Sequence, residues 1–217
     1  MSTPMSTLAI APATTTLMDR LIPVGDDVKG QTIRAVLLTI VGAQLLWISA
    51  KVQVPMWPVP MTMQTYAILA LAGLAGWRVG LSMVALYLAQ GAVGMPVFAG
   101  TPEKGIGLAY MMGPTGGYLL GFLMAAAVAG AASQVRGGMR LVSVVVGMTV
   151  AHLLVFIPGI LWLGGAGFMD GGISAALAYN VSSFWLGTVL KTLLAIATIY
   201  GVWQLTSDRP TSPPSAS

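Results

Sequence analysis

The chain has 217 residues, of which 56% are hydrophobic and only 7% are charged, with a formal net charge of +4. About a quarter of the residues in a soluble domain are charged, so this composition, with a mean hydropathy of +0.85, is typical of a membrane protein. Cysteine is absent and there is one histidine, which excludes disulfides and leaves little material for a metal site or a catalytic pair. No GxxxxGK[ST] sequence occurs, which excludes ATP binding by a P-loop. We therefore expect neither an enzyme nor a bound metal or cofactor.

Both ends of the chain are predicted to be polar tails. In residues 1–30 the first basic residue is Arg20, so no basic segment precedes an apolar run as it would in a secretory signal. Residues 206–217 read "TSDRPTSPPSAS" and lack the apolar side chains that a core needs. We expect both tails to be disordered and cytoplasmic, and residues 31–205 to form one membrane domain that binds a substrate.

Six helices are predicted between the tails. A spanning helix needs roughly 20 mostly apolar residues, and charges, prolines and glycines mark where such stretches end. The resulting helices lie approximately at residues 31–50, 64–76, 79–94, 115–134, 141–163 and 182–205. The predicted fold class is an all-α integral membrane protein with six transmembrane helices.

The basic residues predict the orientation of the chain. If six helices span the membrane and the N-terminus is cytoplasmic, the outer loops carry only Lys51 and Lys104. The cytoplasmic segments then carry seven basic residues, namely Arg20, Lys29, Arg34, Arg78, Arg136, Arg140 and Arg209. Because cytoplasmic loops are enriched in lysine and arginine, we predict that both termini are cytoplasmic.

Small residues recur every fourth position in the first predicted helix, at Ala35, Thr39 and Ala43. This spacing lets another helix approach closely. Packing inside the bundle and docking of a partner membrane protein explain it equally well.

The outer loops are rich in proline, glycine and methionine. Residues 51–65 read "KVQVPMWPVPMTMQT" and residues 94–118 read "GMPVFAGTPEKGIGLAYMMGPTGGY". Irregular backbone at membrane depth is either shielded by protein or lines a wet cavity. These loops are therefore either rigid surface turns or the mouth and lid of a pocket. The aromatic residues Trp57 and Tyr110 belong either to an interfacial belt or to the wall of such a pocket.

Isolated polar residues within the helices are the next candidates. Gln90 and Asn180 lie near outer helix ends, where they serve either as helix-to-helix hydrogen bonds or as ligand contacts. His152 lies in the middle of the fifth predicted helix, and a lone membrane histidine more often bonds across helices than moves protons.

Lys191 is the one charge inside the last apolar stretch. It lies nine residues into the predicted helix, about 13 Å from its start at 1.5 Å per residue. Its side chain either extends outward to the membrane surface or marks a functional site, as intramembrane charges often do. Thr188 is three residues earlier, so both side chains share one helix face. An ammonium and a hydroxyl together would suit a small anionic molecule with polar edges.

These residues leave more than one class of function open. A stand-alone facilitator or secondary carrier of a small anionic metabolite fits them, as does a membrane scaffold that transports nothing. No convincing internal repeat occurs, which weighs against a carrier built from inverted repeats.

Four motifs resemble those of a known family. "PVPMTMQT" (58–65), "LYLAQGAVGMPVFAG" (86–100), "GPTGGYLLGF" (113–122) and "GTVLK" (187–191) are similar to the BioY family, and the likeness covers roughly residues 33–205. Members are the biotin-binding substrate subunits of energy-coupling factor (ECF) transporters. The resemblance implies high-affinity biotin uptake across the inner, cytoplasmic membrane by a six-helix subunit. Its implied partners are a membrane coupling subunit and ATP-binding cassette ATPase subunits, with no role for nucleic acid.

The resemblance also implies roles for individual residues. Lys191 matches the family's lysine in the last helix, and Thr188 stands where the family usually has an acid that contacts biotin; threonine accepts a hydrogen bond without a negative charge. The face of Ala35, Thr39 and Ala43 resembles the family's Ala-xxx-Ala docking face only in being small. The expected substrate-binding residues are Lys191, Thr188, Gln90, Tyr110, Asn180 and Trp57.

Overall fold

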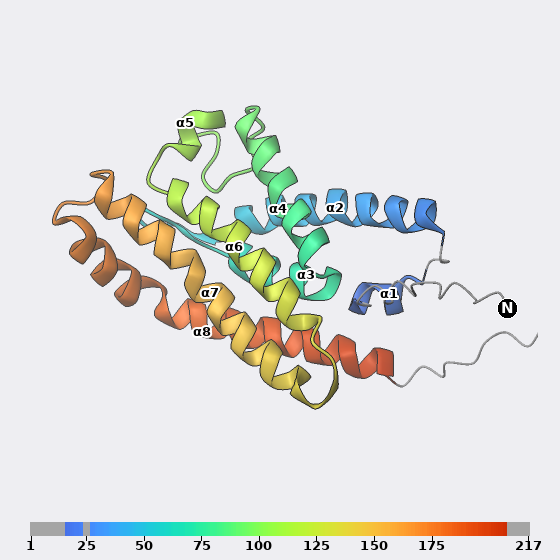
Figure 1. Ribbon diagram of the computed structural model, residues 1–217. Coiled ribbons are helices and arrows are strands. Elements are labelled where there is room, and N and C mark those ends of the chain that lie inside the picture. The colour runs from blue at the N-terminus through green and yellow to red at the C-terminus, as the bar shows by residue number, and fades with distance from the viewer. Residues whose placement is uncertain (1–15, 24–26, 208–217) are drawn as a thin grey trace, which may run out of the picture.

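The computed structural model describes residues 16–23 and 27–207. This part of the chain is almost entirely helical, with one short β-hairpin (Figure 1). The helices are α1 (Leu17–Leu21), α2 (Val28–Lys51), α3 (Gln64–Ala75), α4 (Trp77–Ala92), α5 (Gly107–Met111), α6 (Gly116–Ser133), the 3-10 turn η1 (Gly137–Met139), α7 (Arg140–Gly165) and α8 (Gly172–Ser207). Strands β1 (Gln53–Val54) and β2 (Met61–Thr62) pair antiparallel in the connection from α2 to α3.

Within the described residues, four helices are long and apolar enough to cross a membrane: α2, α6, α7 with η1, and α8. The prediction of an all-α integral membrane protein is confirmed at this level. Helices α3 and α4 have 12 and 16 residues, which is about 18 and 24 Å of helix against a hydrocarbon core of about 30 Å. Spanning by all six helices therefore stays a prediction.

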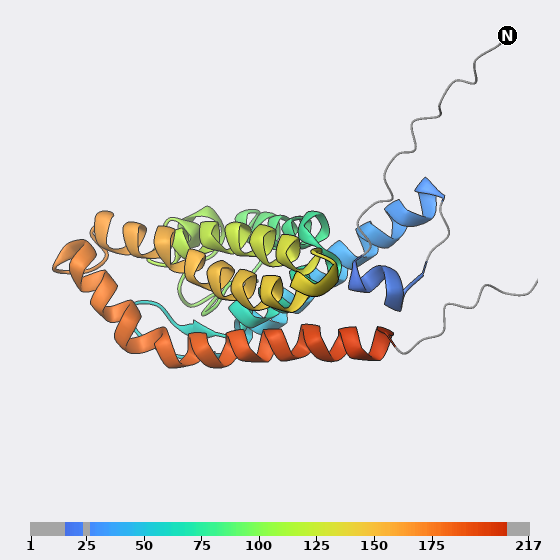
Figure 2. The ribbon, with the colours of Figure 1, turned by 60° about the horizontal axis from the view of Figure 1, so that its bottom comes forward.

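The predicted boundaries agree with the structure within three residues, except at the start of the last helix. Helix α8 begins at Gly172, ten residues before the predicted start, and has 36 residues in all. Gly171 and Gly172 have positive φ angles of 88° and 66°, which turn the chain back from α7 and allow a helix to begin at once. Figure 2 shows α8 running along one side of the bundle and bending partway.

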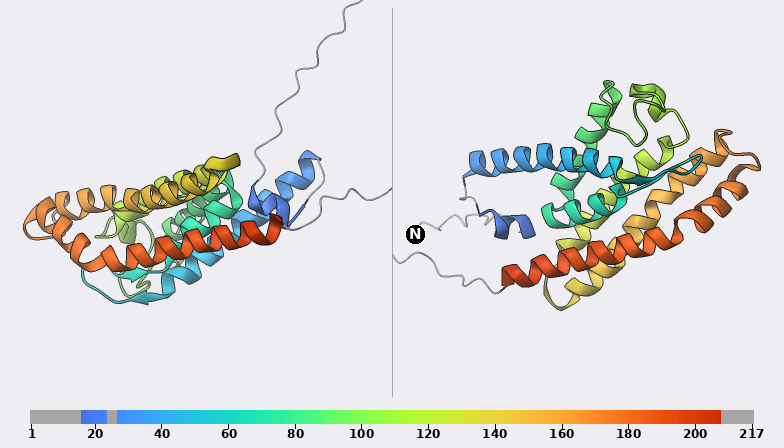
Figure 3. Two further views of the ribbon diagram at one scale, coloured as in Figure 1. Left: turned by 90° about the horizontal axis from the view of Figure 1, so that it is seen from below. Right: turned by 180° about the vertical axis from the view of Figure 1, so that it is seen from behind.

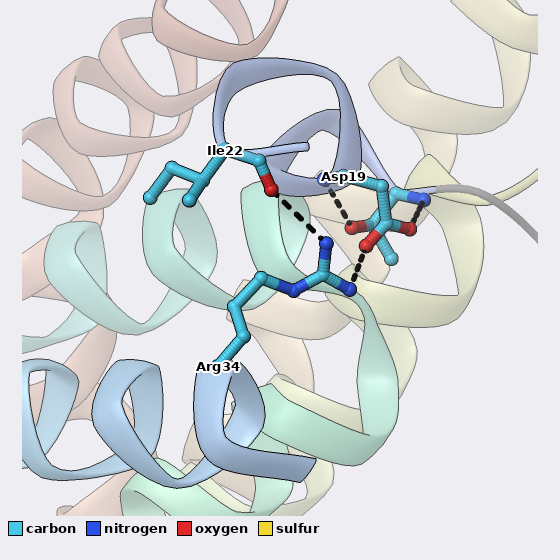
Figure 4. A network of polar contacts seen from close by, with 4 residues as sticks. Asp19, Ile22 and Arg34 are labelled. Carbon is cyan, nitrogen blue, oxygen red and sulfur yellow. Dashed lines mark hydrogen bonds and ion pairs between the residues drawn. The ribbon is translucent and has the colours of Figure 1, made fainter. Parts of the chain in front are cut away.

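The predicted N-terminal tail contains an ordered helix, which corrects the expectation of disorder for that part. Thr16 caps α1 through a capping box with Asp19, a local signal in the sequence that was overlooked. Leu17 is buried, and the α2 side chain of Arg34 pairs with Asp19 and donates to the Ile22 carbonyl at 3.2 Å (Figure 4). Residues 1–15 and 208–217 of the predicted tails lie outside the described residues.

Helices α6 and α7 pack at close range because glycines face α7. A methyl group at Gly117 would lie 2.2 Å from the Pro158 carbonyl oxygen, and one at Gly121 would lie 2.6 Å from the Val155 carbonyl oxygen. Only glycine permits this approach, so the "GPTGGYLLGF" motif first of all specifies a helix contact. The contact turns Tyr118, Leu119 and Phe122 toward the centre of the bundle, where they line a cavity.

The bundle has two dissimilar ends (Figures 1 and 3). One end holds α1, the α3–α4 and α6–α7 turns and the C-terminus of α8, where Arg140 lies 4.7 Å from the ring of Trp203. The other end holds the β-hairpin, α5 and the α7–α8 turn, and the hairpin lies between α2 and α8 (Figure 3, right). The described basic residues of the first end are Arg20, Lys29, Arg34, Arg78, Arg136 and Arg140.

Candidate substrate cavity

A cavity lies inside the bundle at the hairpin end. It encloses about 590 Å³ between its lining atoms, including the space at its mouth. Side chains from the hairpin, α3, α4, α5, α6, α7 and α8 line it. Its lining is Val59, Pro60, Met61, Thr62, Gln64, Thr65, Tyr87, Phe98, Ala99, Tyr110, Thr115, Tyr118, Leu119, Phe122, His152, Val155, Phe156, Phe184, Thr188 and Lys191.

All four sequence motifs converge on this cavity. The motif at 58–65 contributes six lining residues, and those at 86–100, 113–122 and 187–191 contribute three, four and two. Segments that are up to about 130 residues apart in sequence therefore build one site, while glycines in the same motifs allow the packing behind it. A methyl group at Gly91 would lie 1.9 Å from the Phe98 ring, and one at Gly187 would lie 2.6 Å from the Met61 sulfur.

Lys191 is held mostly inside the bundle. It is 9% exposed, and its Nζ donates to the backbone carbonyl oxygen of Thr62 at 3.0 Å. An ammonium group has three donors, and the described residues supply one acceptor. The Thr62 hydroxyl belongs to the same corner, because it contacts Gln64 Oε1 at 3.2 Å. Lys191 therefore has donors left for a molecule in the cavity.

A second polar group connects α7 to the same face of α8. The Thr192 hydroxyl donates to the Thr188 carbonyl oxygen at 2.7 Å, and its oxygen lies 2.7 Å from His152 Nδ1. Thr188, Lys191 and Thr192 are three and four residues apart, so their side chains lie on one helix face. The His152 ring lies nearly parallel to Phe156, with 6.1 Å between the ring centres.

Aromatic side chains form the wall opposite α8. The Phe98 ring stacks on Tyr110 with 4.8 Å between centres and meets Tyr87 edge-on at 5.5 Å. The Tyr110 hydroxyl donates to the Ala99 carbonyl at 2.7 Å, and burial raises the pKa of this phenol. The Tyr87 hydroxyl accepts from Gln64 Nε2 at 2.7 Å. This wall is apolar and rigid, which suits the uncharged part of a small ligand.

The structure brings together three of the six expected binding residues, because Lys191, Thr188 and Tyr110 line the cavity. Asn180 lies behind the wall, where its Oδ1 accepts from the Tyr118 hydroxyl at 2.8 Å. Gln90 and Trp57 are not part of the lining, and Trp57 is 81% exposed.

The sequence reasoning missed several polar lining residues. Thr62, Gln64 and Thr65 belong to the quoted motif at 58–65, so a signal was present, but the loop was interpreted only as rigid surface turns or as the mouth and lid of a pocket. His152 also lines the cavity. Its predicted role as a contact between helices accounts for Nδ1 but not for Nε2.

The loop between α4 and α5 is held in place by Lys51, the last residue of α2. Lys51 Nζ donates to the Phe98 carbonyl at 2.9 Å and to both the carbonyl and hydroxyl oxygens of Thr101 at 3.0 Å. This loop carries Phe98 and Ala99 into the cavity wall. Lys51 thus supports the wall from outside.

The three small residues of α2 divide into two environments. Ala43 is fully buried, so it packs inside the bundle. Ala35 and Thr39 line an open groove between α2 and α4. Among the described residues, no three His, Asp or Glu side chains gather as a metal site would require.

A helical membrane bundle with an aromatic-walled cavity and a lysine ammonium inside it defines a membrane protein that binds a small molecule. Residues 18–208 match the BioY family, and the chain belongs to that family. The predicted resemblance is confirmed.

Individual relatives agree with this assignment. "Probable biotin transporter BioY" of Pyrococcus horikoshii is 35% identical over 150 residues, which is 69% of this chain and 83% of the relative. "Biotin transporter BioY2" of Lactococcus lactis subsp. cremoris is 31% identical over 166 residues, or 76% and 86%. A crystal structure described as the S-component for biotin from an ECF-type ABC transporter has the same fold, with a TM-score of 0.61 and 22% identity, over 82% of this chain and 94% of that one.

Proposed function

We propose that this chain captures biotin and serves as the substrate-specific subunit of an ECF-type transporter. Family membership and the relatives' names support biotin transport. The observation that carries the proposal is the convergence of all four motifs on one cavity with the Lys191 ammonium inside it. An aromatic wall and a few polar groups suit a bicyclic molecule that has an apolar chain, a cyclic urea and a carboxylate.

Isothermal titration of detergent-purified, biotin-free protein tests this proposal. We expect one saturable biotin site, and mass spectrometry should find biotin retained by protein purified without stripping. A flat titration together with no retained biotin would refute biotin capture and leave a different small anion as the ligand.

The energy for uptake comes, in this proposal, from ATPase partners and a membrane coupling subunit. The sequence lacks a P-loop motif, so the chain alone should bind biotin in liposomes without ATP-driven accumulation. Proton-coupled accumulation by the chain alone would instead establish the stand-alone carrier. Accumulation driven by ATP with no other subunit would contradict the assignment of energy to partners.

The docking surface for the coupling subunit is proposed at Ala35 and Thr39, because both line the open groove beside α4. Ala43 is buried and contributes only by letting α2 pack closely. A bulky Thr39→Phe substitution should abolish uptake in cells while biotin binding by the purified chain stays unchanged. Uptake at the wild-type rate would exclude this groove as the docking surface.

We propose further that six helices span the cytoplasmic membrane with both termini inside. The support is the basic end of the bundle, which matches the enrichment of cytoplasmic loops in arginine and lysine. The chain has no cysteine, so a single introduced cysteine is the one thiol of the chain that a maleimide can label. A membrane-impermeant maleimide on intact cells should label Glu103→Cys and not Gly138→Cys, and the reverse labelling would invert the topology.

A further inference from the structure

Among the described residues, one nitrogen of His152 has a hydrogen-bond partner and the other has none. The Thr192 hydroxyl gives its single proton to the Thr188 carbonyl oxygen at 2.7 Å. At its 2.7 Å contact with His152 Nδ1, the same oxygen must therefore accept. In a neutral imidazole one nitrogen carries hydrogen and the other accepts, so Nδ1 carries the hydrogen and Nε2 is the acceptor.

Nε2 has no hydrogen-bond partner among the described residues although its atom is buried. The His152 side chain is 1% exposed and lines the cavity. A buried acceptor without a partner is costly and needs an explanation. Since the Nδ1 side of the ring is bound to α8, the Nε2 side is the one that remains for a molecule in the cavity.

Other polar groups of the lining are also available to a ligand. Thr65 Oγ1, on α3, is buried without a partner among the described residues, and Lys191 has donors left. Lys191 supplies only N–H donors, whereas His152 Nε2 can only accept. A ligand group that satisfies both needs a donor hydrogen beside an acceptor oxygen. The N–H and carbonyl oxygen of an amide or a cyclic urea supply this pair.

We propose that His152 Nε2 accepts a hydrogen bond from an N–H of the ligand's urea, and that the Thr192–Thr188 pair positions His152 by fixing its tautomer. This inference rests on the proposed biotin capture and adds the residue that recognises the urea N–H. His152 therefore has two roles, with Nδ1 joining α7 to α8 and Nε2 binding the substrate.

The chain has one histidine, so labelling untagged protein with histidine that carries ¹⁵N in the imidazole ring gives an NMR spectrum of only these two nitrogens. In the biotin-free protein we expect Nδ1 protonated and Nε2 unprotonated. Saturating biotin should move the Nε2 resonance toward lower chemical shift, as accepting a hydrogen bond does, while Nδ1 changes little. A protonated Nε2 in the free protein, or an Nε2 resonance unmoved at saturation, would overturn the proposal.

Two substitutions separate the nitrogens. Asparagine reaches about as far as Nδ1 and retains the contact to Thr192, whereas glutamine places an amide near Nε2. His152→Gln should bind biotin within about 3-fold of wild type, and His152→Asn should lose about 10-fold, which is about 1.4 kcal/mol. Wild-type affinity in a folded His152→Asn protein, or a greater loss in His152→Gln, would reduce His152 to a helix contact.

Biotin methylated at one urea nitrogen or at the other provides a test without mutation. Wild type should bind one of the two isomers at least 10-fold more weakly than biotin, and His152→Asn should lose that discrimination. Equal binding of biotin and both isomers by wild type would refute the hydrogen bond. A wild type that binds none of the three would instead refute the proposed function, so the two failures are distinguishable.

Discussion

Lys51 and Lys191 both donate to backbone carbonyls at the hairpin end of the bundle, yet they serve different regions. Lys51 gives its three hydrogens to acceptors on the loop that carries Phe98 and Thr101. Lys191 is 9% exposed and has one acceptor, the Thr62 carbonyl, among the described residues. Lys51 holds the loop in place, whereas Lys191 keeps N–H donors available in the cavity. We infer that the number of donors already bonded within the protein distinguishes a structural lysine from one that is proposed to bind a ligand.

The largest expected effect is on biotin binding by Lys191→Met, which retains the chain length and removes the charge. Hydrogen bonds to charged groups contribute about 1.5–3 kcal/mol, so the Kd should rise roughly 10- to 100-fold. Isothermal titration measures it, and Lys51→Met is the matched control with an expected change of at most about 3-fold. A folded Lys191→Met protein with wild-type affinity would remove the distinction between the two lysines.

The affinity for biotin amide tests whether Lys191 faces the urea or the carboxylate of biotin. Because Lys191 shares its helix face with the Thr188–Thr192 pair that holds His152, we expect it to face the urea oxygen, so wild type should tolerate the amide. If wild type instead rejects the amide and Lys191→Met binds acid and amide alike, Lys191 pairs with the carboxylate.

Gly91→Ala should damage the loop region by steric conflict. The added methyl would lie 1.9 Å from the Phe98 ring, and that ring is held between Tyr87 and Tyr110. Overpacking of this kind costs about 1–3 kcal/mol, which thermal unfolding in detergent should detect as a lower melting temperature. Gly201→Ala is the control, since nothing lies within 4 Å of its methyl and alanine favours helix. Equal melting temperatures for both variants would contradict the tight packing of the loop.

Lys51→Met should loosen the same loop by a smaller amount. Its three acceptors lose their donor, but the group is partly solvated, so roughly 1 kcal/mol is expected. Hydrogen exchange at residues 97–106 should become faster, while exchange in α6 and α7 stays unchanged. Unaltered exchange in the loop would show that the Phe98 stacking alone holds it.

Trp57→Phe should have the smallest effect on affinity, within about 2-fold, because Trp57 is 81% exposed and outside the cavity. Its neighbours Val59, Pro60 and Met61 line the cavity, so biotin should still alter the surroundings of Trp57. We expect a change in tryptophan fluorescence on biotin addition that Trp57→Phe largely removes. A full change in the variant would show that another tryptophan reports biotin binding, and it would withdraw support for the hairpin loop as the lid of the cavity.

Most of the helical plan could be predicted from sequence because apolar length and the positions of charges, prolines and glycines are local properties. The start of α8 was predicted ten residues too late, because adjacent glycines indicate a turn but do not show how soon the next helix begins. Helix α1 was missed because it is only five residues long and because its stability depends on the burial of Leu17 and on the pairing of its Asp19 with Arg34 of α2. Of the expected binding residues, Asn180, Gln90 and Trp57 were chosen for polarity or aromatic character alone, which does not specify direction.

The sequence by itself determined a membrane chain of apolar helices and the BioY resemblance, and it singled out Lys191 as a candidate binding residue, since each depends on residue identity and spacing along one segment. Only the tertiary structure decided which side chains share the cavity. Thr62 reaches Lys191 across 129 residues of sequence, and His152 reaches Thr192 across 40. It also decided that Lys51 is saturated whereas His152 Nε2 is not. The physical reason is that a hydrogen-bonding group acquires its role from the partners that packing brings to it, and those partners lie on other helices.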